Sequence, residues 1–527
     1  MPITPTYPGL YIEELPSNAH TITAAATSIT VFVGYTHPFK TRSFGTAVLL
    51  FSFTDYEREF GGLYASAIVE HDVAYAVNQF FLNGGSVAYV IGLNPQTLDK
   101  NGAVVLPGPI PQATATVGNI VFTAREPADV IPMKVTVNNL KATVPLGNLD
   151  IADITIAYGT QAETYRAVTI AGDTKAPNYI DNRFKDPGSG LLLSGLVTVA
   201  STGGGYGTTI TPADHQPFVI TLPAGFATTF SEKDFIDVFQ QDRAIDKIPI
   251  FNLLAIPGVA DNAVWSAALS FCEGKRAFVI LDPPEQAAAD SSTPKLPAIG
   301  DIIADQKLPT SVNGALYFPY LLSLDPLTGN PIELPPSGFV AGIFARTDLN
   351  RGVWKAPAGL ETIINNTIGV VARGRMTDQR QGTLNPVGVN CIRTFPNAGT
   401  VVFGARTQVT ANPSFQQWRY VPVRRMALFI EQTLLMNLGW AVFEPNDNPL
   451  WVALRTTVEN FMLSLFNQGA FQGSTPSKAF RVTCDGTTTT QQDIDNGVVN
   501  IIVAFAPLKP AEFVIIKIAQ LAGQTQA

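Results

Sequence analysis

Histidine and cysteine are the residue types in this sequence that could bind a metal or act as nucleophiles. The histidines are His20, His37, His71 and His215, and the cysteines are Cys272, Cys391 and Cys484. A metal site needs several such ligands at short, regular spacings, and these residues lie far apart. We interpret the histidines as structural or surface residues and the cysteines as buried thiols of a chain made in a reducing compartment. The sequence predicts no cofactor and no metal.

Other catalytic patterns are incomplete. The glycine-rich run at 203–209 lacks the Gly-Lys-Ser/Thr ending of a phosphate-binding loop, and no Gly-x-Ser-x-Gly nucleophile elbow is present. An enzyme built on residues 231–281 would need polar groups at strand ends, where only Asp282 is available. Arg351, Trp354 and Lys355 fit a domain-packing loop better than a binding cluster. We predict that the protein is not an enzyme.

The charge content is low for a chain of this size. Only 14% of the 527 residues are charged, against roughly 25% in a typical soluble protein, which favours a surface buried against other copies. The net charge of -8 and the lack of a basic run argue against nucleic acid as a partner. The longest apolar runs are too short for a membrane helix, and the N-terminus has no signal-peptide pattern. We expect synthesis and assembly in a bacterial cytoplasm, without membrane insertion.

The order of strand and helix patterns predicts a multidomain α/β and α+β chain. Residues 21–95 read as strand, helix and strand, with helical spacing over 67–82, and residues 231–281 alternate in the same way, which favours a parallel sheet. Between them, frequent Gly and Pro with short strand patterns, such as 120–124, predict an all-β module.

The last third combines two helices with two strands. The helices are expected at 423–438 and 449–467, the second with Asp447 as its cap and Pro449 in its first turn. The strands are expected at 480–484 and 498–505.

The C-terminal end is a strand pattern with no obvious partner. Residues 513–518 are Phe, Val, Ile, Ile, Lys and Ile, and they follow a spacer that contains Pro507 and Pro510. The prolines disfavour a tight hairpin back onto 498–505. An apolar strand must be paired, so it either forms an ordinary edge strand or adds to the sheet of another subunit. The proline-bracketed strand pattern at 4–16 could do the same at the other end.

Several motifs in the same order resemble contractile tail sheath proteins, the family that surrounds the tube of phage tails and of phage tail-like injection systems. One is Phe443-Glu444-Pro445-Asn446-Asp447. The others lie at 4–14, 32–34, 350–359, 388–393, 418–425 and 506–518. The resemblance covers roughly residues 1–95 and 230–527. It implies a conserved α/β sheath core with an inserted all-β outer domain and extended N- and C-terminal β arms.

The resemblance assigns parts of the chain to this plan. The implied divisions are an N-terminal arm at 1–20, the first part of the core at 21–95, the outer β domain at 96–200, an α/β sheath domain at 201–350, a tube-facing C-terminal α+β domain at 351–505 and a C-terminal arm at 506–527. The arm strands would contain Tyr7, Leu10, Tyr11, Ile12, Glu13, Phe513, Val514, Ile515, Ile516, Lys517 and Ile518. The acceptor strand would contain Val499, Ile501, Ile502 and Val503, with Pro507 and Pro510 as the arm hinge.

The implied function is structural. Subunits would stack as hexameric rings in a helical homo-oligomer around an inner tube, and contraction would drive the tube through a target envelope. Implied partners are further copies, the tube protein, and the baseplate and tail-terminator or cap proteins. Arg424, Arg425 and Arg455 could face an acidic tube or form a solvated helix face. The final site would be a virion tail, or a contractile particle that is released or stays anchored to the cell. The alternative is another self-assembling shell or surface-layer protein.

Overall fold

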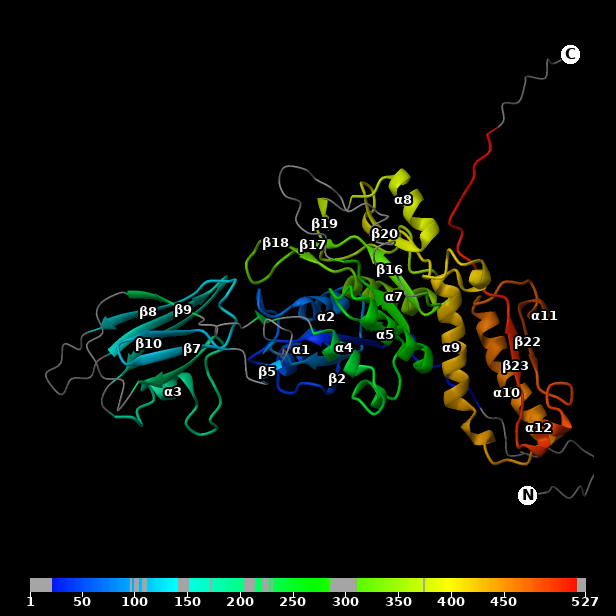
Figure 1. Ribbon diagram of the computed structural model, residues 1–527, viewed down its shortest axis with the longest axis horizontal. Coiled ribbons are helices and arrows are strands. Elements are labelled where there is room, and N and C mark those ends of the chain that lie inside the picture. Colours follow the sequence, from blue (N-terminus) through cyan, green and yellow to red (C-terminus); the bar gives the residue numbers. More distant parts are fainter. Residues whose placement is uncertain are drawn as a thin grey trace, which may run out of the picture. The chain divides into compact units, whose positions relative to one another are not determined.

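The computed structural model of the chain describes most of the sequence (Figure 1). The described residues are 21–94, 97–98, 104–106, 111–140, 151–170, 173–202, 214–219, 227–228, 231–284, 310–372 and 375–518. They form two compact units. The larger unit contains residues 27–350 and 356–421, and the smaller contains residues 1–26, 351–355 and 422–527. The two units are described separately below.

An eight-stranded, mostly parallel sheet forms the centre of the larger unit. Its strand order is β2-β3-β1-β14-β15-β16-β20-β21. The strands are β1 (Thr30–Tyr35), β2 (Ala47–Leu50), β3 (Ala88–Leu93), β14 (Leu253–Ala255), β15 (Phe278–Leu281), β16 (Gly314–Phe318), β20 (Val389–Phe395) and β21 (Gly399–Val402). Only β2 and β21, the two edge strands, pair antiparallel. The central strands are apolar and buried along their length, as expected for a parallel sheet covered on both faces.

Helices cover this sheet because their apolar side chains fit against it. They are α1 (Phe53–Phe60), α2 (Asp72–Leu82), α4 (Glu232–Val238), α5 (Asn262–Lys275), α7 (Ser337–Arg351) and α8 (Asp378–Leu384). Phe80 of α2 packs edge-on against Phe32 of β1, with ring centroids 5.5 Å apart. Phe344 of α7 packs against Tyr317 of β16 in the same way, at 6.1 Å. The predicted parallel sheet with crossover helices is therefore present.

A β-rich region lies between β3 and α4 in the sequence. One sheet has the order β10-β9-β8-β12 and another has the order β11-β7-β6. Their strands are β6 (Thr114–Val117), β7 (Ile120–Ala124), β8 (Met133–Leu140), β9 (Ile151–Tyr158), β10 (Gln161–Thr169), β11 (Val197–Ser201) and β12 (Asp214–Pro217), and α3 (Ile180–Phe184) lies beside them. Alternate residues of β9 are buried, which gives this region its own apolar core. That it forms an outer domain of the assembled particle stays a prediction.

Among the described residues of the larger unit there are also two small sheets and three 3-10 turns. One sheet contains β17 (Leu321–Leu324), β18 (Pro331–Leu334) and β19 (Gly369–Val370), and the other contains β4 (Thr97–Leu98), β5 (Val104–Leu106) and β13 (Ala227–Thr228). The 3-10 turns are η1 (Ile245–Lys247), η3 (Asn385–Val387) and η4 (Pro413–Trp418).

The smaller unit packs two long helices against a two-stranded sheet. Its elements are α9 (Val421–Asn437), η5 (Gly439–Ala441), α10 (Asn448–Asn467), α11 (Pro476–Ala479), β22 (Phe480–Thr483), α12 (Gln491–Asp495) and β23 (Ile502–Phe505). Buried Met426, Phe429, Phe461 and Met462 join the two helices into one apolar cluster, and Val503 and Phe505 of β23 pack against it. Asp447 and Pro449 begin α10 as the sequence predicts: the Asp447 carboxylate accepts a hydrogen bond from the Leu450 N–H.

Some predicted boundaries are wrong, for reasons visible in the contacts. The helix predicted from residue 67 begins at Asp72, because the Ala67 and Ile68 N–H groups donate to the Asp129 carboxylate instead. The strand predicted from residue 498 begins at Ile502, because the Val498 N–H closes the end of α12 on the Asp493 carbonyl. Residues 356–421 lie in the larger unit, whereas we predicted a single C-terminal domain from residue 351. The reason is that β20 pairs with β16.

Candidate assembly surface

The C-terminal segment carries apolar side chains that contact little of the described chain. Phe513, Val514, Ile515, Ile516 and Ile518 are 73% to 92% exposed. Residues 511–518 form no strand, so their backbone pairs with no strand among the described residues. Water solvates apolar surface unfavourably, by about 25 cal/mol per Å². This segment is therefore an apolar ribbon that a sheet edge could accept.

The sheet formed by β22 and β23 is small and open. Four residue pairs join the two strands, from Phe480↔Phe505 to Thr483↔Ile502, and no third strand joins the sheet among the described residues. A two-stranded sheet alone is marginally stable, and a third strand would satisfy the backbone groups of an open edge. Ile502 is 55% exposed, whereas Ile501 and Val503 pack against the helices. Of the predicted acceptor residues, Ile502 and Val503 lie in the strand, and Val499 and Ile501 precede it.

The chain leaves this sheet at a defined point. The Ala506 N–H donates to the Ala479 carbonyl at 2.8 Å, and the Ala506 carbonyl accepts from the Gln472 N–H at 2.9 Å. Pro507 forms an isolated bridge with Phe471. Pro507 is thus held in place, and the segment that departs begins after it. Of the two prolines predicted as a hinge, Pro507 is bridged to Phe471, and Pro510 lies in the segment that leaves the sheet.

Residues 21–26 are attached to the same compact unit. The side-chain amide of Asn437, at the end of α9, donates to the Thr23 carbonyl and accepts from the Thr23 N–H, both at 2.9 Å. One turn earlier, the Thr433 hydroxyl accepts from the Ala25 N–H at 3.1 Å. These contacts lead residues 21–26 along α9. The predicted arm residues Tyr7, Leu10, Tyr11, Ile12 and Glu13 lie outside the described residues.

The predicted tube-facing arginines differ in their surroundings. The Arg424 side chain is mostly buried, and its guanidinium lies 3.5 Å from the Glu431 carboxylate, two helical turns along α9. Arg425 is 3% exposed, so in the described chain it is a core residue and cannot present a charge to a partner. Arg455 of α10 is half-buried. The helical periodicity of the sequence did not show which of Arg424 and Arg425 is buried. Adjacent residues on a helix point about 100° apart, so either could face the core.

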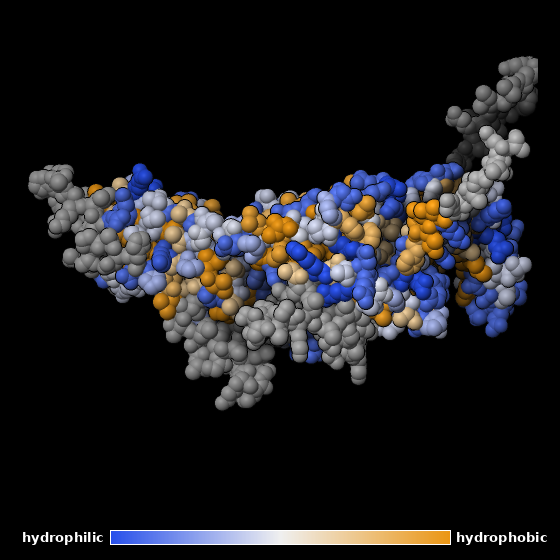
Figure 2. Space-filling view, turned by 90° about the horizontal axis from the view of Figure 1, so that it is seen from above, coloured by the Kyte–Doolittle hydropathy of each residue, from blue (hydrophilic) through white to orange (hydrophobic). Residues whose placement is uncertain are grey.

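The loop between α9 and α10 exposes an apolar residue that our sequence reading missed as a surface group. Phe443 is fully exposed and has a φ of 71°, in the left-handed region that a bulky residue rarely occupies. The loop around it is fixed, since the Trp451 indole N–H donates to Asn446 and the Asn446 side-chain amide donates to the Val498 carbonyl. Figure 2 shows that hydrophobic side chains gather in several separate patches on the face in view.

The three cysteines and His37, which by residue type could bind a metal or act as nucleophiles, are buried. Cys272, Cys391 and Cys484 are free thiols and are buried, and burial raises the pKa of each. His37 is buried beside Glu126, and His71 precedes α2. Within the ranges given above, no three His, Cys, Asp or Glu side chains converge as metal ligands. No helix among those residues is long and apolar enough to cross a membrane.

These features define a mixed α/β protein with apolar surface of the kind that assembly buries. Residues 243–408 match the phage tail sheath protein central domain, and residues 414–520 match the phage tail sheath C-terminal domain. The chain belongs to the tail sheath protein family.

A tail sheath protein of Salmonella phage ViI is 28% identical over 177 residues, which cover 34% of this chain and 26% of the phage protein. The match therefore spans about a quarter of the length of the curated relatives.

Two solved structures share the fold over nearly the whole chain. One is the sheath complex of an extracellular contractile injection system, PVC, in its contracted state. It is 22% identical, with a TM-score of 0.58 and a coverage of 98% of each chain. The other is the helical sheath of the anti-feeding prophage in its contracted state. It is 24% identical, with a TM-score of 0.57, and the match covers 98% of this chain and 100% of that one. The fold is that of a contractile sheath subunit.

Proposed function

We propose that this chain is the structural subunit of a contractile sheath. It polymerises as stacked hexameric rings around an inner tube and contracts to drive that tube through a target envelope. It has no catalytic role. The proposal is supported by membership of the tail sheath family and by the fold shared with two sheaths in their contracted state. A head-to-tail contact that does not close on itself builds a helix of such subunits.

The observation that carries the proposal is the exposure of residues 513–518, which follow an open two-stranded sheet in the chain. In the polymer, this segment of one subunit lies beside β23 of another and adds a third strand to its sheet. Backbone hydrogen bonds give the contact its strength, and alternate apolar side chains give it register. The leucine, lysine and proline at 508–510 form the spacer between the anchored Pro507 and the donated strand.

The N-terminal segment has the same role in the proposal. Residues 21–26 follow α9 in the smaller unit, so the first and last described residues belong to the unit that contains the acceptor sheet. Tyr7 and residues 10–13 would then form a second donated strand. With two donated strands, each subunit is linked to several copies at once. The links can persist while the broad faces between subunits repack during contraction.

Other surfaces of the subunit contact the inner tube, the outside of the particle and the proteins at its ends. The helices α9 and α10 face the inner tube, with Arg424 and Arg455 as its cationic contacts, and the β-rich region faces outwards. The end rings contact the baseplate and a terminator or cap protein. Assembly takes place in the bacterial cytoplasm. A non-phage injection particle is supported by the fold, since the matches to the PVC and anti-feeding prophage sheaths each cover 98% of this chain.

The experiment is electron microscopy of purified protein. A chain lacking residues 508–527 keeps Pro507 and all of β23, so we expect a folded protein with an unchanged circular dichroism spectrum that forms no tubes. In the full chain, Ile515→Pro removes a strand N–H and is expected to abolish tubes. The matched variant Ile515→Val keeps the donor and the β-branched shape, and it should form tubes.

Each outcome separates one reading from another. Hollow tubes of uniform diameter from the wild type, absent with Ile515→Pro, support the sheath and its donated strand. Tubes from the truncated chain contradict strand donation by the C-terminal segment. Flat sheets or closed shells would replace the sheath proposal with a surface-layer or shell protein, and single particles at every concentration would contradict assembly altogether.

A further inference from the structure

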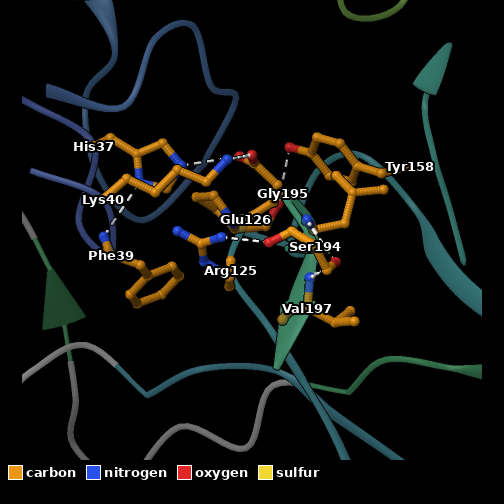
Figure 3. A network of polar contacts seen from close by, with 12 residues as sticks. His37, Phe39, Lys40, Arg125, Glu126, Tyr158, Ser194, Gly195 and Val197 are labelled. Atoms are coloured by element: carbon orange, nitrogen blue, oxygen red, sulfur yellow. Dashed lines mark hydrogen bonds and ion pairs between the residues drawn. The ribbon is translucent and has the colours of Figure 1, made fainter. Parts of the chain in front are cut away.

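A buried carboxylate joins the β-rich region to the rest of the larger unit. We call that rest the parallel-sheet region: it contains the eight-stranded sheet, its covering helices and the small sheet of β17, β18 and β19. Glu126 follows β7, and its side chain is 6% exposed. One carboxylate oxygen lies 2.9 Å from Nε2 of His37, and the other accepts a hydrogen bond from the Lys40 ammonium (Figure 3). His37 and Lys40 belong to the segment after β1, the central strand of the parallel sheet. The contact therefore connects two parts of the fold that are far apart in sequence.

The hydrogen bonds define the protonation state of this contact. Nδ1 of His37 accepts from the Phe39 N–H at 3.2 Å, so the ring proton is on Nε2 and is donated to Glu126. A neutral imidazole and an ionised carboxylate satisfy this geometry, and Lys40 supplies the positive charge. Arg125 lies beside the same contact and donates to the Ser194 carbonyl. Glu126 and Lys40 therefore form an ion pair, and neutral His37 donates a hydrogen bond to the same carboxylate.

A second carboxylate makes a similar connection a few residues further on. One oxygen of Asp129 accepts from the Ala67 N–H at 2.8 Å, the Ile68 N–H at 3.2 Å and the Ser66 hydroxyl at 2.9 Å. Three donors of the segment before α2 thus point at one oxygen from the β-rich region. A carboxylate that accepts backbone N–H groups forms charge-assisted bonds, which are stronger than neutral ones.

The hairpin between β9 and β10 makes the third connection. The Thr160 N–H donates to the Leu327 carbonyl at 3.0 Å, and its hydroxyl donates to the Pro326 carbonyl at 3.2 Å. Gly159 has a φ of 55°, and a Cβ built there would be 2.5 Å from the Leu327 carbonyl oxygen. Leu327 itself is buried in the apolar core of the β-rich region, as is Ala65. That core is therefore continuous with residues of the parallel-sheet region.

We propose that these contacts form an acid-sensitive lock, which holds the β-rich region rigidly on the parallel-sheet region at neutral pH and releases it in acid. We call the contacts of Glu126 and Asp129, together with those of Thr160, the joint. With the joint closed, the two regions move as one body. With it open, they are connected only by the covalent chain and by apolar contacts such as those of Ala65 and Leu327. The inference concerns this chain by itself and does not depend on the proposed function.

The burial and neighbouring charges of His37 favour opening of the joint in acid. Burial lowers the pKa of His37 below its ordinary 6.5, although the neighbouring Glu126 opposes the shift. The positive charges of Lys40 and Arg125 lower it further, and the Tyr64 ring covers the imidazole at 5.2 Å. A group whose pKa is lowered by folding favours the folded arrangement at high pH. That contribution is lost as the pH falls below 6.5 through the folded pKa.

The second titrating group acts in the same direction. Burial opposes ionisation of Glu126, but the hydrogen bonds and charges of His37 and Lys40 outweigh it and hold the pKa below its ordinary 4.5. The neighbouring Tyr158 hydroxyl donates to the Pro127 carbonyl and is neutral, because burial raises its pKa. Protonation of Glu126 at lower pH removes the partner of the Lys40 ammonium. Both groups therefore weaken the joint as the solution becomes acidic.

The test is amide hydrogen exchange, read by mass spectrometry on the full chain from pH 7.5 to pH 4, with rates corrected for the intrinsic effect of pH. The reporters are peptides that contain residues 37–41, 66–69 and 159–160. We expect the three to lose protection together as the pH falls, while β8 and β9 stay protected. At pH 7.5, Glu126→Gln should raise exchange in all three by about tenfold or more, because it leaves Lys40 without its partner.

The control is Glu57→Gln, which removes an exposed carboxylate of α1 in the same unit and should leave the three peptides unchanged. Should Glu126→Gln fail to fold, the wild-type pH series decides alone. Protection from exchange that persists at pH 4 in all three peptides would contradict the opening of the joint in acid. Loss of protection in β8 and β9 at the same pH also overturns it, because the region would then unfold and not detach.

Discussion

Gly338 of α7 lies directly against the backbone of Ala76 in α2. A Cβ built on Gly338 would be 2.5 Å from the Ala76 Cα, closer than real Cβ contacts allow. One turn further along α7, a Cβ on Gly342 would be 2.7 Å from the Phe80 carbonyl oxygen. The two helices therefore approach closely because two glycines, spaced one helical turn apart, leave room for the neighbouring backbone.

We expect Gly338→Ala to destabilise the larger unit by about 2 kcal/mol or more, since the added methyl meets backbone that cannot rotate away. The measurement is the midpoint of thermal unfolding by calorimetry or circular dichroism. The matched control is Gly274→Ala in α5, where a Cβ would meet nothing within 4 Å. This control should be neutral or gain up to about 1 kcal/mol, because alanine is the better helix former. Equal effects of the two variants would contradict the close approach.

The buried carboxyl of Asp282 predicts a pH dependence of the opposite sign to that of Glu126. Burial raises the pKa of Asp282 to about 7, although the Ser337 side chain and the Gly258 and Ser337 N–H groups donate to it. A raised folded pKa gives a contribution that is complete below the ordinary value of 3.8. It is lost as the pH rises through 7. At pH 8 this group should cost the larger unit roughly 4 kcal/mol relative to its neutral form.

Asp282→Asn isolates this effect, because the amide stays neutral at every pH. We expect the unfolding temperature of the variant, relative to the wild type, to rise as the pH is taken from 4 to 8. Asp186→Asn is the control: hydrogen bonds from Ser189 and Gly188 lower the pKa of that exposed carboxyl below its ordinary 3.8, so its difference from the wild type should stay nearly constant from pH 4 to pH 8. A constant difference between Asp282→Asn and the wild type across the range would show that Asp282 is ionised throughout.

The fold class could be predicted from the sequence because its apolar patterns match the residues that the fold buries. Residues 278–281 are a short apolar run followed by Asp282, and they form a strand buried along its length in a parallel sheet. Asp447 and Pro449 are typical of the start of a helix, and α10 begins there. The strand at 120–124 was also predicted with its observed bounds. In each case local preference and tertiary packing favour the same structure.

Other features depend on contacts between distant residues, which no local pattern contains. Residues 67–71 have helical spacing but are not helical, because the Ala67 and Ile68 N–H groups donate to Asp129 of the β-rich region instead. The joint at Glu126 was invisible, because a lone His37 and a lone Lys40 give no signal until the fold brings a carboxylate between them. The route of residues 21–26 along α9 depends on the amide of Asn437, which the sequence offers as an ordinary helix-end residue.

The three buried cysteines should be chemically inert in the folded chain. Burial raises the pKa of Cys272, Cys391 and Cys484, so little thiolate is present at pH 8, and the reagent cannot reach the sulfur. We expect no reaction with a thiol-specific disulfide reagent in native protein within minutes, and complete reaction of all three in denaturant. Rapid labelling of any one of them in the native state would show that its surroundings open.

The N-cap of α10 should contribute measurably to the smaller unit. The Asp447 carboxylate accepts from the Leu450 N–H at 3.2 Å and places a negative charge at the positive end of the helix. We expect Asp447→Ala to lower the free energy of unfolding of that unit by about 1 kcal/mol. Asp447→Ser, which keeps an oxygen acceptor, should retain most of the stability. The readout is the unfolding transition followed by Trp451, which lies in the first turns of α10 and packs in the apolar cluster there. If the alanine and serine variants unfold alike, the side-chain hydrogen bond does not stabilise the helix, and the loop that displays Phe443 must be held by Asn446 alone.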